Sequence, residues 1–227
     1  MLRSILFAAL IAGTLTGILS TAIQHLQVIP LIQWAEQYET DAHANQHDHA
    51  SSNQEGDRHD SSDELERNLF TLLSNVLAGI GFAMLLASAI TLSEQRGWRK
   101  GLLWGLAGYF CFFVAPGLGL TPKLPGTAGA ALEHQQIWWI ATVVASVLGL
   151  GLIVFAKQII FKVVGLGFVI MPYVVGAPLP ELAFSAAPET LQQKFIIASS
   201  LANAGFWIIL GTLSGYLLRN KDTENES

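Results

Sequence analysis

Six long apolar stretches follow one another along the chain, separated by polar segments. They occupy residues 5–29, 69–92, 101–120, 137–156, 160–176 and 195–218. Each is about 17 to 25 residues long, the length that an α-helix needs to cross a hydrocarbon layer about 30 Å thick. The pattern predicts an all-α protein, a polytopic transmembrane helical bundle of about six spanning helices.

Two features of this pattern leave alternatives open. Residues 157–159 are the shortest link, so residues 137–176 form either two helices or one long kinked helix, and the second choice gives five spans. The first stretch also resembles a cleaved signal peptide, because Arg3 precedes an apolar core and residues 20–22 suit a cleavage site. The apolar pattern continues past that site to Ile29, which favours a retained helix.

The charges predict how the bundle is oriented, because cytoplasmic loops are enriched in Lys and Arg. With the N-terminus in the cytoplasm, the inner segments hold eight of the 12 Lys and Arg residues, and the outer segments hold 13 of the 17 Asp and Glu residues. The predicted topology is N-in, C-in. It divides the chain into a first transmembrane helix (1–29), an outer His/Asp-rich loop (30–68), a five-helix transmembrane region (69–218) and a cytoplasmic tail (219–227).

Composition and missing motifs narrow the class further. Apolar residues make up 52% of the chain and charged residues only 13%, whereas soluble domains carry about 25% charged residues. The single cysteine, Cys111, excludes an internal disulfide and a thiolate metal cage. The sequence has no GxxxxGK[ST], HExxH or GxSxG pattern, so nothing predicts ATP hydrolysis or another enzymatic activity.

Between Glu39 and Asp60 the outer loop combines imidazole and carboxylate groups and is almost free of apolar residues. Cobalt(II), nickel(II) and zinc(II) accept such nitrogen and oxygen ligands. We predict weak, exchangeable metal capture by this loop, and the alternative is a solvated linker. The candidate ligands in the loop are His43, His47, His49 and His59.

Further candidate metal ligands lie near the outer ends of the predicted helices. His25 precedes the end of the first helix, and Glu36 and Glu39 follow at helical spacing; Glu133 and His134 stand at the entrance of the fourth helix. An ionisable residue at such depth is costly without a partner, which makes it a functional candidate. The alternatives are an interfacial histidine and a salt-bridged helix start.

Proline and asparagine residues interrupt the apolar helices. Pro116 and Pro172 should kink or end the third and fifth helices, and such broken helix ends are where transporters often bind ions. Asn75 and Asn203 lie at similar depth and are either ion ligands or interhelical hydrogen-bond partners. Three GxxxG pairs predict helix packing, within the chain or with a second subunit: Gly13 and Gly17, Gly101 and Gly105, and Gly211 and Gly215.

Five segments together resemble the CbtA family of predicted cobalt transporter subunits: QHLQVIPLIQWAEQYE, GLLWGLAGYFCFFVAPGLGLTPKLPG, HQQIWWIATVVASVLGL, MPYVVGAP and ASSLANAGFWIILGTLSGYL. The resemblance implies a multi-pass protein of the bacterial inner membrane that takes up cobalt for cobalamin synthesis. It also implies a small single-helix, His-rich partner (CbtB-like). The chain departs from the family pattern at Lys123, His134 and Tyr173, and the last departure weakens a metal site at Pro172.

The residues and the resemblance together favour a permease subunit for a divalent transition metal, cobalt first, with an outer histidine-rich capture loop. The metal is cargo, and no prosthetic group or nucleic acid is expected. The expected partners are the lipid bilayer, the small subunit and a second copy of the chain. The alternatives are a non-transporting scaffold or metal-sensing assembly factor, a nickel or zinc transporter, and an exporter.

Overall fold

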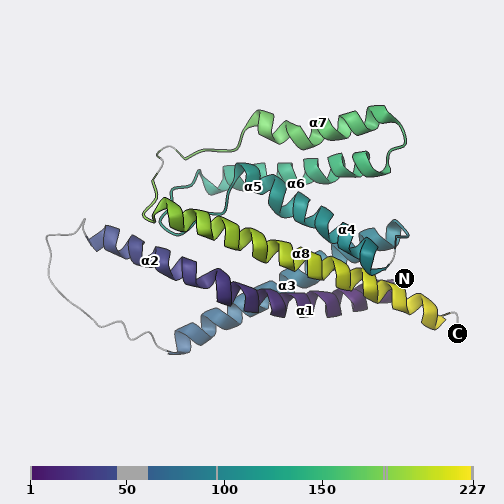
Figure 1. Ribbon diagram of the computed structural model, residues 1–227, viewed down its shortest axis with the longest axis horizontal. Coiled ribbons are helices and arrows are strands. Elements are labelled where there is room, and N and C mark those ends of the chain that lie inside the picture. Colours follow the sequence, from purple (N-terminus) through teal and green to yellow (C-terminus); the bar gives the residue numbers. More distant parts are fainter. Residues whose placement is uncertain (1, 45–60, 96, 181, 183, 226–227) are drawn as a thin grey trace.

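The protein is described here by a computed structural model that places residues 2–44, 61–95, 97–180, 182 and 184–225. Among these residues every regular element is a helix, and the helices lie roughly along one common direction (Figure 1). The predicted all-α helical membrane bundle is thereby confirmed.

Five helical segments in the described part of the chain are long and apolar enough to cross a membrane. The first is α1 (Leu2–Gln27), which α2 (Ile29–Ala44) continues after one turn residue. The second is Leu65–Leu92 within α3 (Ser61–Leu92), and the third joins α4 (Trp98–Tyr109), the π-helix η1 (Phe110–Val114) and α5 (Ala115–Gly119). The last two are α6 (Leu132–Phe155) and Glu189–Arg219 within α8 (Glu189–Asn225).

The sixth apolar helix, α7 (Ile159–Val175), is shorter. Its 17 residues span about 26 Å at about 1.5 Å per residue, the lower limit for a crossing. It ends three residues after Pro172, where Gly176 adopts φ 87° and its N–H bonds the Pro172 carbonyl at 3.0 Å. The proline therefore does not stop the helix, which ends at Val175, one residue short of the end predicted from sequence.

The short link after α6 joins two separate helices. Ala156 and Gln158 take extended backbone conformations, with ψ of 137° and 136°, and this breaks the helix. The two helices then lie side by side as a hairpin (Figure 1). This excludes the single kinked helix, and it brings the end of α8 to the same end of the bundle as the start of α1 (Figure 1).

The GxxxG pairs serve packing within the chain. Gly13 and Gly17 of α1 contact α3, and a Cβ added to Gly13 would lie 2.5 Å from the Ile80 Cα. Gly101 and Gly105 of α4 face Gly211 and Gly215 of α8, backbone against backbone. Small residues allow such close approach in lipid, where helix association depends on packing rather than on water exclusion.

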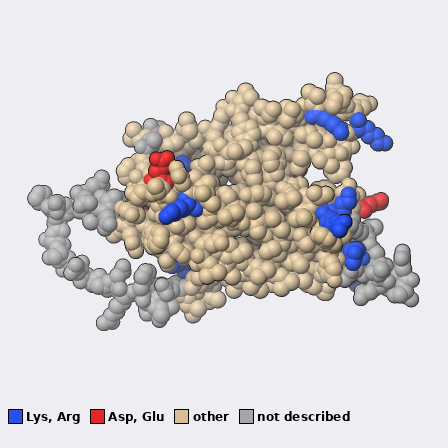
Figure 2. Space-filling view, in the orientation of Figure 1, with Lys and Arg blue, Asp and Glu red and all other residues tan. Residues whose placement is uncertain are grey.

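Most of the outward surface is apolar, as contact with lipid requires. Exposed Leu, Ile and Val side chains cover all helices that cross, and α7 contacts mainly α6 while its large side chains are mostly exposed. Lys and Arg side chains gather at the end where α1 begins and α8 ends (Figure 2). This clustering agrees with the charge pattern behind the predicted N-in, C-in topology.

Candidate functional site

The α5–α6 and α7–α8 connections pack on each other at the end of the bundle opposite the basic cluster. The Ala128 N–H donates to the Phe184 carbonyl at 2.8 Å. Gln192 of α8 fixes the first connection, because its side-chain amide donates to the Pro122 carbonyl at 2.6 Å and accepts from the Leu124 N–H at 3.1 Å. The two proline-containing connections are thus held together and to α8.

The proline in the third span does not end its helix. The helix continues through Pro116 to Gly119, and η1 immediately precedes the proline. A π-helical turn changes the hydrogen-bond register, which accommodates a residue that has no N–H to donate. The Tyr173 hydroxyl of α7 donates to the Ala115 carbonyl at 2.8 Å. The two proline-bearing helix ends are therefore bonded to each other, and the Tyr173 hydroxyl serves this contact.

The five candidate ligands near the outer helix ends do not gather into one metal site. His25 is exposed at the end of α1, Glu36 is exposed and Glu39 half-buried on α2, and Glu133 and His134 are exposed in the first turn of α6. In the described ranges, no three His, Cys, Asp or Glu side chains come close enough to hold a metal ion together. Each of these five residues remains a predicted metal ligand. It would bind the ion alone or together with ligands outside this set.

The structure does not describe the side chains of the four loop histidines. His47, His49 and His59 lie outside the described residues, and the structure describes the backbone of His43 but not its side chain. Metal capture by the loop therefore stays a prediction from sequence. The ends of α2 and α3 that flank the loop lie at the same end of the molecule as the proline-containing connections (Figure 1).

A polar cavity of about 170 Å³ lies between the spanning helices. Its polar lining comes from Ser20 and Gln24 of α1, Asn75 of α3 and Asn203 of α8. All four positions belong to the half of their span that is nearer the outer connections. The predicted similar depth of Asn75 and Asn203 is confirmed, since both line this one cavity.

Amide groups from α1 and α3 are hydrogen-bonded across the cavity wall. The Asn75 side-chain N–H donates to the Gln24 Oε1 at 2.8 Å and to the Thr21 hydroxyl at 3.0 Å. The Gln24 N–H approaches the Asn75 Oδ1 at 3.4 Å, a long and weak contact. Asn75 is therefore an interhelical hydrogen-bond partner, and its side-chain oxygen accepts the long contact from Gln24.

The Asn203 amide and the aromatic walls complete the cavity. Asn203 donates to the Ser199 carbonyl of its own helix at 3.0 Å, and no hydrogen bond to its side-chain oxygen is recorded within the described part of the chain. Aromatic rings surround the polar groups, with Phe82 and Phe112 in edge contact at 5.1 Å between centroids. The aromatic lining consists of Phe82, Phe112, Trp139, Phe206 and Trp207.

The cavity offers neutral oxygen ligands and no carboxylate. Its volume has room for about five water molecules at about 30 Å³ each, so a hydrated or partly hydrated cation fits better than a bare one. Amide and hydroxyl oxygens replace some water contacts without holding the ion tightly, and such weak binding permits passage. The electron-rich faces of aromatic rings also attract cations.

Sequence reasoning did not identify the full lining. Gln24 was not singled out from the sequence, and Ser20 appeared only within a possible cleavage site, yet both line the cavity. The available signal was a polar residue inside an apolar helix, which is uncommon and often functional. The aromatic walls carried no such signal, because Phe and Trp are ordinary residues in a membrane span.

The fold and the cavity define a polytopic helical membrane protein with a pocket between its spans, lined by four polar side chains and by aromatic rings. The chain belongs to the family described as "Probable cobalt transporter subunit (CbtA)", which matches residues 2–219. Comparisons with curated proteins and with solved structures gave no match.

Proposed function

We propose that the chain is a permease subunit that takes up a divalent transition metal, cobalt first, across the bacterial inner membrane for cobalamin synthesis. The family description supports cobalt as the cargo and a subunit as the role. The observation that carries the proposal is the amide-lined cavity between α1, α3 and α8, because polar groups in a membrane interior mark solute pathways.

The proposed route begins at the histidine-rich loop. The loop gathers ions, and His25, Glu36, Glu39, Glu133 and His134 pass them toward the outer ends of α5 and α7. Four of these side chains are exposed and Glu39 is half-buried, which suits brief single-ligand contacts. The metal then enters the cavity, where Gln24, Asn75 and Asn203 replace part of its hydration shell.

The word subunit in the family description implies a partner. The proposed partner is a small single-helix protein with a histidine-rich end, which would supply further imidazole ligands at the outer surface. Such a partner is consistent with the separation of the candidate ligands in this chain, since no described group of three or more is close enough to form a metal site alone.

Reconstitution in liposomes tests the proposal. The purified chain is inserted into vesicles that contain a cobalt-quenched dye, alone or with the small partner, and cobalt(II), nickel(II) or zinc(II) is added outside. The expected result is faster quenching by cobalt than in protein-free vesicles. Flux that requires the partner supports the subunit role. Absence of flux with and without the partner would leave the non-transporting scaffold, and faster nickel or zinc flux would reassign the cargo.

A further inference from the structure

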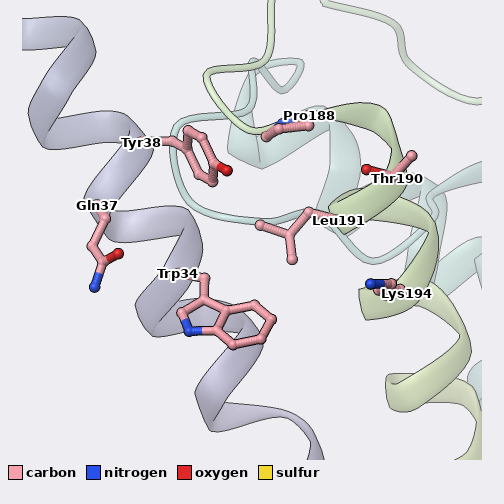
Figure 3. A pocket seen from close by; sticks show the side chains of 7 residues that line it. All are labelled: Trp34, Gln37, Tyr38, Pro188, Thr190, Leu191 and Lys194. Atoms are coloured by element: carbon pink, nitrogen blue, oxygen red, sulfur yellow. The ribbon is translucent and has the colours of Figure 1, made fainter.

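A groove of about 490 Å³ separates α2 from the beginning of α8. In Figure 3 the rings of Trp34 and Tyr38 point from α2 toward α8, and Leu191 lies between the two helices. Lys194 faces the same space from α8, one turn further into the bundle than Thr190. The groove lies apart from the amide-lined cavity and shares no lining residue with it.

The polar groups of the groove are suited to an anion. Lys194 supplies an ammonium group, and Tyr38 and Thr190 supply O–H donors. Among the described side chains that line the groove there is no carboxylate, and Lys194 has no ion pair within the described ranges. A phosphate group would satisfy these donors, whereas a quaternary or primary ammonium group would find no counter-charge there.

The position of Lys194 along α8 places the anion at the edge of the membrane. Lys194 is exposed, and the exposed side chains that follow it on the same helix face, Ile197 (59%) and Leu201 (62%), are apolar. Positions three and seven residues apart share a face of an α-helix. The half-exposed Trp34 and Tyr38 add the aromatic residues that are typical of the headgroup level.

We propose that this groove binds a phospholipid with an anionic headgroup. The phosphate lies between Lys194 and the Tyr38 hydroxyl, and an acyl chain runs along Ile197 and Leu201. The charge complementarity and the adjoining apolar stripe both support this occupant. A free inorganic phosphate would use only the charge complementarity and not the apolar stripe. A zwitterionic lipid would leave its ammonium group unpaired.

The test uses the full chain in nanodiscs made of phosphatidylcholine alone or mixed with phosphatidylglycerol. The measurement is the amount of each lipid that stays bound when the protein is released into detergent and weighed by native mass spectrometry. Lys194→Gln should weaken phosphatidylglycerol binding about five-fold, which corresponds to about 1 kcal/mol for one basic residue at the surface. Lys194→Arg should retain binding.

The matched control is Lys123→Gln, on the same side of the molecule. The Lys123 ammonium donates to the Ala128 carbonyl at 2.9 Å and does not line the groove, so this variant should bind phosphatidylglycerol like the wild type. Equal retention by Lys194→Gln and wild type, or equal retention of phosphatidylcholine, would overturn the proposal. Displacement of phosphatidylglycerol by inorganic phosphate would also overturn it, in favour of a soluble anion. Helicity measured by circular dichroism verifies that each variant is folded.

Discussion

Asn75→Leu separates the two roles open to this residue, interhelical bonding and cation contact. Asn75 donates two well-formed hydrogen bonds to α1, at 2.8 Å and 3.0 Å, and the third contact at 3.4 Å is weak. Interhelical hydrogen bonds in membranes contribute about 0.6 kcal/mol each on average. Loss of both strong bonds should therefore lower the free energy of unfolding by only about 1 kcal/mol.

Transport should respond more strongly than stability. The substitution removes an oxygen from the cavity and places an apolar side chain in the proposed path, so we expect cobalt uptake to fall at least about ten-fold, equivalent to about 1.4 kcal/mol. The assay measures initial cobalt uptake in cells, normalised to the folded protein, together with thermal unfolding in detergent.

Asn68→Leu is the matched control for this experiment. Asn68 lies on α3, two turns before Asn75, and does not line the cavity. The same chemical change there should leave uptake near that of the wild type. If Asn75→Leu reduces uptake no more than Asn68→Leu does, Asn75 acts only as a packing and hydrogen-bonding residue, and the reasoning about the cavity is refuted.

Three further predictions concern the outer ligands and the helix contacts. His25→Ala should reduce cobalt accumulation at limiting supply, measured by metal analysis of whole cells, and unchanged accumulation would remove His25 from the path. Deletion of residues 41–60 should raise the half-saturating cobalt concentration more than it lowers the maximal rate, and identical uptake curves would show that the loop is a linker. Gly211→Ala should lower the free energy of unfolding by about 2 kcal/mol, because its Cβ would lie 2.6 Å from the Gly105 Cα; Gly81→Ala, with no atom within 4 Å of its Cβ, is the control and should not lower it.

The sequence predicted the helical architecture well because the bilayer imposes it. A run of apolar residues long enough to cross lipid has to satisfy its backbone internally, and a helix does so. The proline effects were less predictable. Both helices continue for three residues past their proline, to Gly119 after Pro116 and to Val175 after Pro172. The π-helix η1 precedes only Pro116, and no local sequence pattern predicts a π-helix.

The candidate site was predicted in part. Asn75 and Asn203 were recognisable as polar residues in apolar helices, and they do share a cavity. The Gln24–Asn75 pairing depends on the register of α1 against α3. Gly13 and Gly17 set this register where they pack against α3. The groove between α2 and α8 arises from the change of direction after α1 and from the outer connections, so its lining is spread over positions with no common spacing.

The proposed uptake route requires metal ions to enter at the end of the bundle that carries the histidine-rich loop. A topology reporter fused after residue 45, with an enzyme that is active only outside the cytoplasm, tests this directly in growing cells. With the N-in, C-in topology, we expect an active reporter at this position and an inactive one when the fusion follows the last residue of the chain. An inactive, cytosolic reporter after residue 45 would contradict the proposed direction of entry.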